Sequence, residues 1–205
     1  MQTALIFAGG DPLPPGLVGE LPRADLVVAA DGGYDAALAL DVAVDVLVGD
    51  LDSISRPDIP EHVIVERHSP DKDATDLELA LALVCRDSPD RIVVAGGSGG
   101  RVDHEIAVAA LLCSPRWDQA EVDWISTRGR AHVVRGRRII HGDVGSILSL
   151  LPMHGDALGI TTKGLRWALD DETLPAGSTR GVSNVMDSPV ADVRVRSGCL
   201  LAVVV

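Results

Sequence analysis

Four continuous apolar runs, each ending in glycine or aspartate, constrain the fold of this 205-residue chain more than any other feature of its sequence. A strand that alternates polar and apolar residues has one face in water, whereas a continuously apolar strand is buried on both faces, as in a parallel sheet. The first part of the chain therefore predicts a buried, mostly parallel sheet. The four runs are ALIFAGG (4–10), ADLVVAAD (24–31), VDVLVGD (44–50) and DRIVVAGG (90–97).

Helical patterns follow these runs, and a further strand is expected at HVIVERH (62–68). Strand and helix thus alternate along the chain. This alternation predicts an α/β domain with a doubly wound, Rossmann-like sheet. The expected helices are Tyr34–Leu40, Asp76–Arg86 and Asp103–Cys113.

The chain changes character near residue 124, where we place the boundary between an α/β domain (1–124) and a smaller all-β domain (125–205). The first part holds 23 acidic and 8 basic residues, a net charge of −15, and the second holds 7 and 10, a net charge of +3. Short β-branched runs interrupted by glycine predict a β-sandwich-like second domain. Its last two strands are expected to form a hairpin that turns at Arg196-Ser197-Gly198. The expected antiparallel runs are 131–142, 145–153, 158–165 and 191–205.

Composition argues against several classes of function. With a net charge of −12 and only 2% aromatic residues, the chain lacks the basic, base-stacking surface of a nucleic-acid-binding protein. Its six histidines show no metal-ligand spacing, which argues against a zinc hydrolase. No apolar stretch approaches the roughly 20 residues of a membrane span, and no basic signal-peptide start is present, so we expect a cytoplasmic protein. The cysteines lie in apolar runs and are expected to be buried thiols: Cys85, Cys113 and Cys199.

Polar, glycine-containing turns follow each of the four apolar strands. The carboxyl ends of parallel strands meet at one edge of the sheet, which is where open α/β sheets bind ligands. Side chains far apart in sequence are therefore expected to converge there. The four turns are AGGD (8–11), ADGGYD (30–35), VGDLDS (48–53) and GGSGGRVDH (96–104).

The turn VGDLDS holds Asp50 and Asp52, two residues apart at a strand end. In an extended chain such residues point the same way, and paired carboxylates repel each other unless a cation lies between them. Mg²⁺ is the natural candidate because it prefers oxygen ligands. The alternative is an Asx turn that closes the strand.

The segment PDKDATDLELALALV (70–84) predicts a helix start, because Thr75 and Glu78 fit the capping box. Acidic residues at a helix start also favour the helix dipole, so a purely structural interpretation is open. Three aspartates exceed what a cap requires, however, and a metal or a cationic substrate facing this turn would account for the surplus. These residues are Asp71, Asp73 and Asp76.

The turn GGSGGRVDH lies between a strand and a helix and predicts an anion site, because glycine-rich backbone presents N–H groups to phosphate. Arg101 adds a guanidinium suited to phosphate. Asp103 either caps the helix or faces the same metal. Asp31 is a further candidate for the acidic cluster.

Six motifs in this order resemble the thiamine pyrophosphokinase family. The resemblance implies an N-terminal α/β domain, a C-terminal β domain, and a homodimer with active sites between its subunits. It also implies Mg²⁺-dependent transfer of pyrophosphate from ATP to the hydroxyl of thiamine, with release of AMP. The motifs are ADGGYD, VGDLDSI, DATDLELAL, GGSGGRVDH, GLRWAL (164–169) and GVSN (181–184).

The resemblance also assigns roles to individual residues. Asp50, Asp52 and Asp76 would hold Mg²⁺, and Asp31, Asp73 and Asp103 would join the acidic cluster. Asp73 or Asp103 would orient or deprotonate the thiamine hydroxyl. The nucleotide would lie against Asp31, Gly32, Gly33, Gly97, Gly99, Gly100 and Arg101, and thiamine against Trp167, Ser183 and Asn184.

The sequence departs from the family pattern at Val44, where proline is expected, and at Val185, where an acidic residue commonly follows Ser-Asn. The second departure lies near the expected acceptor pocket. Two alternatives therefore stay open: the same reaction on another heterocyclic alcohol, such as a pterin, and a non-enzymatic sensor of nucleotide or thiamine on the same scaffold.

Overall fold

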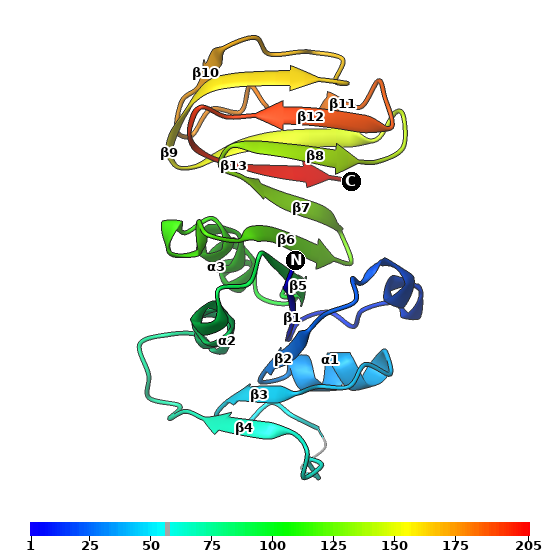
Figure 1. The fold of residues 1–205 in the computed structure, drawn as a ribbon, viewed down its shortest axis with the longest axis vertical. Coiled ribbons are helices and arrows are strands. Elements are labelled where there is room, and N and C mark those ends of the chain that lie inside the picture. Colours follow the sequence, from blue (N-terminus) through cyan, green and yellow to red (C-terminus); the bar gives the residue numbers. More distant parts are fainter. Residues whose placement is uncertain (56–57) are drawn as a thin grey trace. The chain divides into compact units, whose positions relative to one another are not determined.

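The computed structural model describes residues 1–55 and 58–205, and the chain divides into two compact units (Figure 1). The first unit comprises Met1–Val108 and Gln119–Thr127, and the second comprises Ala109–Asp118 and Arg128–Val205. Within the described residues, no helix combines the length and the apolarity needed to cross a membrane.

The first unit is built on a parallel sheet with the strand order β4-β3-β2-β1-β5-β6. The chain starts at β1, adds strands on one side as far as β4, and then returns to add β5 and β6 on the other side. This winding confirms the predicted doubly wound sheet, and its direction changes between β1 and β5. The strands are β1 (Thr3–Ala8), β2 (Leu26–Ala30), β3 (Val46–Gly49), β4 (Ile64–Arg67), β5 (Arg91–Gly96) and β6 (Glu121–Ser126).

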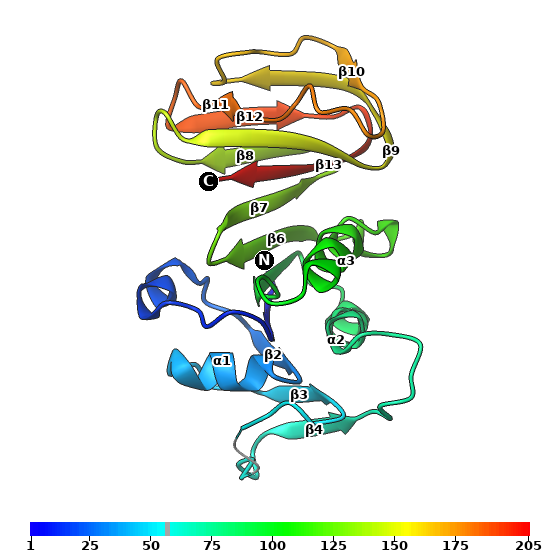
Figure 2. The ribbon, with the colours of Figure 1, turned by 180° about the vertical axis from the view of Figure 1, so that it is seen from behind.

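The central strands are buried on both faces, as their continuous apolar sequences predicted; Ile6 and Phe7 on β1, for example, are both fully buried. Helix α1 (Gly33–Ala39) packs on the face that holds Phe7 and Leu47. Helix α2 (Asp76–Val84) contacts β1, β2 and β3 and lies across the sheet from α1 in both ribbon views (Figures 1 and 2). Helix α3 (Val102–Leu112) follows β5, and short 3-10 turns occur at Pro15–Glu20, Cys85–Asp87 and Pro115–Trp117.

Strand β6 was absent from the strands expected from sequence. It pairs in parallel with β5, and its sequence EVDWIS holds a charged residue, Asp123, in the middle of the strand. Asp123 is only 2% exposed, and Arg91 neutralises it through hydrogen bonds of 2.8 and 2.6 Å. An ion pair between a buried aspartate and a partly exposed arginine of the neighbouring strand therefore takes the place of the apolar residue that sequence patterning looks for.

The second unit is an antiparallel β domain organised around one long strand, β9 (Ile147–Lys163). Strands β13, β12, β11 and β10 all pair with β9, and β7 and β8 extend the arrangement through β13 and β12. Its apolar core draws on β7, β8, β9, β10, β12 and β13 together, as expected for a sandwich-like domain. The remaining bounds are β7 (Gly129–Val134), β8 (Arg137–His141), β10 (Glu172–Leu174), β11 (Asn184–Val185), β12 (Val190–Arg194) and β13 (Ser197–Val204).

Two expectations about this domain were wrong. The runs 145–153 and 158–165 were expected as separate strands, yet β9 continues through both of them. The expected terminal hairpin is also absent among the described pairings, because β12 pairs with β8 and β9 while β13 pairs with β7 and β9. The chain bends at Arg196, and Ser197 and Gly198 already belong to β13. The length of β9 lets both flanking strands pair with it instead of with each other.

Candidate active site

Three aspartates converge where β2 and β3 end and α2 begins. Asp31 follows β2, Asp50 follows β3, and Asp76 is the first residue of α2. Each offers a carboxylate oxygen, and these oxygens all lie within 4.8 Å of one another. Parallel strands that end at one edge, with a helix that starts there, are what bring the three residues together.

Gly49 makes this approach possible. It has a φ of +147°, and a Cβ at this position would lie 3.0 Å from Asp76 Oδ1 and 3.1 Å from the Cβ of Asp31. Any side chain here would push against both acidic residues. The glycine before Asp50 is therefore a steric requirement of the cluster.

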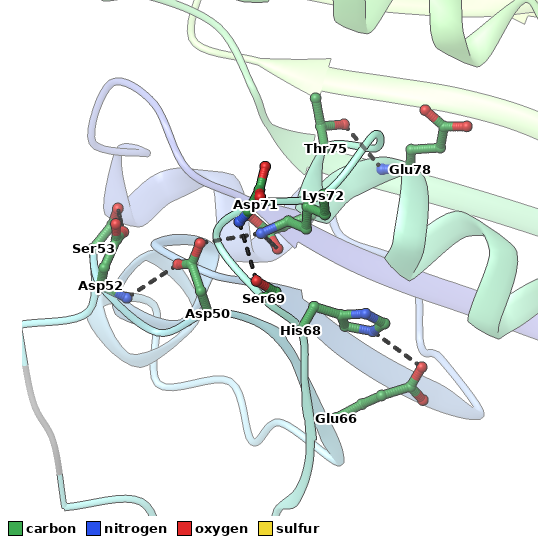
Figure 3. A network of polar contacts seen from close by, with 11 residues as sticks. Asp50, Asp52, Ser53, Glu66, His68, Ser69, Asp71, Lys72, Thr75 and Glu78 are labelled. Carbon is green, nitrogen blue, oxygen red and sulfur yellow. Dashed lines mark hydrogen bonds and ion pairs between the residues drawn. The ribbon is translucent and has the colours of Figure 1, made fainter.

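Lys72 is the residue of this site that the sequence analysis missed. Its Nζ lies 3.1 Å from Asp50 Oδ2 (Figure 3). The same Nζ lies 3.1 Å from Asp76 Oδ1. The contact with Asp50 is a hydrogen bond, whereas the contact with Asp76 is an ion pair that lacks hydrogen-bond geometry. The only sequence signal was a lysine between two aspartates, which alone looks like an ordinary solvated loop.

The electrostatics of the cluster follow from Lys72 and from burial. The hydrogen bond from Lys72 lowers the pKa of the Asp50 carboxyl below its usual value. Burial raises the pKa of the Asp76 carboxyl, although Lys72 acts in the opposite direction. Asp31 Oδ1 and Asp76 Oδ1 are buried and accept no hydrogen bond from the residues that the structure describes. Asp31 Oδ1 could therefore bind a cation directly, whereas Asp76 Oδ1 could do so once Lys72 Nζ moves away from it.

Asp52 lies outside this group of three, although the sequence had paired it with Asp50 as a metal ligand. That pairing assumed an extended backbone, whereas Leu51 between them is left-handed, with a φ of +69°. The N–H of Asp52 donates to Asp50 Oδ1 at 3.3 Å, and its own carboxylate accepts from Ser53 Oγ at 2.8 Å. The structure thus has the Asx-type turn that the sequence left open as an alternative.

The helix start at Asp76 was predicted correctly. Thr75 is the N-cap, and its Oγ1 accepts a hydrogen bond from the N–H of Glu78 at 3.2 Å. Asp73 lies exposed in the segment that leads to this cap and is not one of the three clustered acids. The capping residues therefore fix where Asp76 begins the helix and where its carboxylate lies.

Arg101 and Asp103 bind each other at the start of α3. Two hydrogen bonds of 3.1 and 2.5 Å join the guanidinium to the carboxylate, and both side chains are exposed. The hydrogen bonds from Arg101 lower the pKa of Asp103 to about 2. In this arrangement Asp103 does not belong to the clustered carboxylates, and Arg101 is held beside the glycine-rich turn by a pairing that a phosphate can compete for.

The glycine-rich turns after β1 and β5 are bonded to each other. The N–H of Gly97 donates to the carbonyl of Gly9 at 3.0 Å, and the N–H of Asp11 donates to the carbonyl of Ser98 at 2.8 Å. These bonds lie where the winding of the sheet changes direction, which is the usual ligand position in such sheets. The expected nucleotide site thus has a firmly held backbone.

The glycines expected to bind the nucleotide differ in how much space surrounds the position of a Cβ atom. A Cβ on Gly33 would collide with the carbonyl of Phe7, and a Cβ on Gly99 would collide with the carboxylate of Asp11. Gly100 has a φ of +65° and open space around the position of a Cβ. Gly32 and Gly97 show only ordinary contacts of 3.4 Å or more, with Gly97 left-handed at a φ of +70°.

The residues expected on the thiamine side, Trp167, Ser183 and Asn184, lie together in the second unit. Trp167 is 58% exposed, whereas Asn184 is only 7% exposed. Asn184 Oδ1 accepts from the N–H of Trp167 at 3.1 Å, and its Nδ2 donates to the carbonyl of Trp167 at 2.7 Å. Ser183 is left-handed, with a φ of +61°, and its N–H donates to Ser149 Oγ at 3.0 Å. Asn184 thus fixes the backbone that presents the exposed indole.

Comparisons with known proteins match both parts of the chain. The family model described as "Thiamin pyrophosphokinase, catalytic domain" matches residues 19–123, and the one described as "Thiamin pyrophosphokinase, vitamin B1 binding domain" matches residues 136–200. Thiamine pyrophosphokinase of Bacillus subtilis is 29% identical over 194 residues, covering 90% of this chain and 89% of that protein. Thiamine pyrophosphokinase 1 of rice is 28% identical over 201 residues, covering 80% and 73%. A crystal structure of the Bacillus subtilis thiamine pyrophosphokinase superposes with a TM-score of 0.85 at 25% identity, covering 99% of this chain and 98% of that one.

Proposed function

The chain belongs to the thiamin pyrophosphokinase family, and on this premise we propose that it transfers the pyrophosphoryl group of ATP to the hydroxyl of thiamine, giving thiamine diphosphate and AMP. The observation that supports this most strongly is the cluster of Asp31, Asp50 and Asp76 at the carboxyl edge of a doubly wound sheet. Edges of this kind bind nucleotides, and clustered carboxylates suit the divalent cation that accompanies them.

The donor set fits Mg²⁺. Three carboxylate oxygens lie within 4.8 Å of one another, and the buried oxygens Asp31 Oδ1 and Asp76 Oδ1 accept no hydrogen bond from residues 1–55 or 58–205. Hard oxygen ligands of this kind are what Mg²⁺ prefers. We therefore propose Asp31, Asp50 and Asp76 as its ligands, in place of the set with Asp52 that the sequence suggested. Bound Mg²⁺ would supply charge neutralisation for the polyphosphate oxygens.

The protein's own part in the reaction is to position the reactants. The turn at 96–101 offers backbone N–H groups and the Arg101 guanidinium to the polyphosphate, once phosphate replaces Asp103 as the partner of Arg101. The hydroxyl oxygen of thiamine then attacks the β-phosphorus and AMP leaves. Asp73 and Asp103 are the two candidates to orient that hydroxyl, and Asp103 is free to do so only when Arg101 has turned to the phosphates.

The acceptor side of the proposal rests on Trp167. An exposed indole face is suited to the cationic thiazolium of thiamine, and Asn184 holds its backbone in place. We propose that residues 125–205 bind the acceptor and form a homodimer, that residues 1–124 bind nucleotide and metal, and that the active site lies at the subunit interface. A cytoplasmic location, where ATP and Mg²⁺ are plentiful, completes the proposal.

An assay of AMP formation tests this function. Purified protein is given ATP and either thiamine or a hydroxymethylpterin, with and without Mg²⁺. We expect AMP only with thiamine and Mg²⁺, and we expect Asp50→Asn to lower kcat/KM by about a hundredfold or more because it removes a charged ligand. AMP formation with the pterin alone would reassign the acceptor, and ligand binding without AMP release under any condition would favour a sensor.

A matched control is Asp41→Asn. Asp41 is exposed and left-handed, with a φ of +57°, a conformation that asparagine adopts readily. This variant loses the same charge as Asp50→Asn without touching the cluster, so its activity is expected to match the wild type. Thermal unfolding of both variants checks that the loss in Asp50→Asn is not a loss of fold.

A further inference from the structure

Lys72 occupies the cluster where a divalent cation would bind. Its ammonium points to the carboxylate of Asp50, 3.1 Å from Oδ2 (Figure 3). It also lies 3.1 Å from Asp76 Oδ1, and the side chains of Lys72, Asp50 and Asp76 are largely shielded, at 16%, 12% and 22% exposure. We infer that Lys72 is an internal counter-ion, which compensates the carboxylates while the site is free of metal and must be displaced when the cation binds. This inference rests on the proposed metal site.

Competition follows from the identity of the contacted atoms. A cation held by Asp50 and Asp76 would draw on the carboxylates that Lys72 already contacts, and the buried Asp76 Oδ1 could bind a metal only once Lys72 Nζ moves away from it. An ammonium and a divalent cation that contact the same carboxylates would lie only a few ångströms apart, and two positive charges so close repel each other strongly in a shielded site. Occupancy by the ammonium and occupancy by the metal are therefore alternatives.

The net charge of the cluster shows how replacing the Lys72 ammonium by a metal ion would affect metal binding. Three clustered carboxylates carry −3, and the ammonium of Lys72 reduces this to −2. The lysine thus lowers the affinity for a divalent cation that arrives alone. A cation that arrives with a polyphosphate brings a new anionic partner for the released ammonium. Lys72 thereby favours the metal–nucleotide complex over the bare metal, which is a positioning role and not a catalytic one.

The sequence offers a matched control, because it contains only two lysines, Lys72 and Lys163. Lys163 is an exposed residue at the end of β9 in the second unit. Lys72→Met and Lys163→Met therefore remove the same charge, one inside the cluster and one outside it. Lys72→Arg keeps the charge in the cluster and completes the set.

The direct test is a titration of the nucleotide-free protein with Mn²⁺. Electron paramagnetic resonance measures the concentration of free Mn²⁺ at each step and so gives the dissociation constant. We expect Lys72→Met to bind Mn²⁺ roughly tenfold more tightly than the wild type, because it removes the competing ammonium. Lys163→Met should bind like the wild type, and Lys72→Arg no more tightly than the wild type. Equal affinities in Lys72→Met and the wild type would overturn the counter-ion role and leave the metal site standing. No binding by any variant would contradict the metal site itself.

A second measurement needs no substitution in the cluster, so it does not depend on whether a Lys72 variant folds. Wild-type protein labelled with ¹⁵N at the lysine side chains gives two ammonium signals, and Lys163→Met identifies which one belongs to Lys72. Addition of Mg²⁺ is expected to shift the Lys72 signal and leave that of Lys163 in place. A Lys72 signal that stays unchanged at Mg²⁺ concentrations that fill the site would refute displacement.

Discussion

Asn184 offers the sharpest test of how the second unit presents its exposed tryptophan. Its buried side chain makes three hydrogen bonds: Oδ1 accepts from the N–H groups of Trp167 at 3.1 Å and Val185 at 2.8 Å, and Nδ2 donates to the Trp167 carbonyl at 2.7 Å. Asn184→Ala leaves all three backbone groups without this partner. At about 1 kcal/mol for each bond, with some compensation by water, we expect the free energy of unfolding to fall by about 2 kcal/mol.

Asn184→Asp tests the role of the side-chain donor, Nδ2, apart from that of the acceptor, Oδ1. It keeps an oxygen for the two N–H groups but puts a second carboxylate oxygen in place of Nδ2, 2.7 Å from the Trp167 carbonyl. Two acceptors at that distance repel each other, so Trp167 should be displaced although the volume of residue 184 is unchanged. An apolar control is Val182→Ala, an exposed neighbour, which should change stability by less than about 0.5 kcal/mol.

Two assays follow these variants. Urea unfolding measures stability, and acrylamide quenching of fluorescence measures the environment of Trp167, since the other tryptophans, Trp117 and Trp124, are only 3% and 9% exposed. In both Asn184 variants we expect altered quenching and a KM for thiamine that rises more than kcat falls. Wild-type quenching, stability and KM in Asn184→Ala would refute the assignment of Asn184 as the residue that positions Trp167.

Three further substitutions test other parts of the structure. Gly49→Ala should destabilise the fold by about 1–2 kcal/mol and weaken Mn²⁺ binding, because a Cβ would lie 3.0 Å from Asp76 Oδ1 at a φ of +147°; thermal unfolding and the Mn²⁺ titration check this. Thr75→Ala removes the N-cap of α2 and should cost about 1 kcal/mol in thermal unfolding. Hydrogen bonds from Arg194 and Arg137 lower the pKa of Asp192 to about 2. The charged carboxylate therefore stabilises the folded state at pH values above the unfolded-state pKa, and this contribution is lost as the pH falls through the folded-state pKa. Asp192→Asn should therefore be about 1 kcal/mol less stable than the wild type near neutral pH, and the difference should vanish between about pH 5 and pH 2 in urea unfolding at a series of pH values.

Local signals made the first unit predictable. The continuous apolar runs found the buried parallel strands, and the capping residues Thr75 and Glu78 fixed the start of α2 at Asp76. Strand β6 was not predicted because the charge of Asp123 breaks its apolar run, and its partner Arg91, 32 residues earlier, helps to make that charge tolerable inside the sheet. A pairing over such a distance leaves no mark on the local pattern.

In the second unit, the errors came from pairing and not from strand propensity. The strand-forming residues were recognised, but sequence patterning does not say which strand pairs with which. Gly155, with a φ of +134°, lies within β9, in the gap between the two runs that were expected as separate strands. The strand continues through this gap, and the resulting 17-residue β9 pairs with both of the strands that were expected to form a hairpin, β12 and β13.

The acidic cluster shows how far sequence reasoning can lead. Together with the family resemblance it placed six aspartates in one cluster, and the structure brings three of them together: Asp31, Asp50 and Asp76. Sequence reasoning also paired Asp52 with Asp50, because a leucine gives no sign that it will adopt a left-handed φ of +69°. Leucine rarely adopts this conformation, so the turn must be imposed by its surroundings and not by its own preference.

Asp76 reconciles the two interpretations that the sequence left open for the acids before α2. As the first residue of the helix, its carboxylate interacts favourably with the helix dipole, which is the structural role. The Oδ1 of the same carboxylate is buried, meets the ammonium of Lys72, and accepts no hydrogen bond within the described part of the chain, which suits the metal-ligand role proposed for Asp76. Burial raises its pKa, and the ammonium of Lys72 opposes that effect. Because the ammonium and the helix dipole both belong to the protein chain itself, the carboxylates can be assembled before any cation binds, and the proposed metal would meet a site that folding has already built.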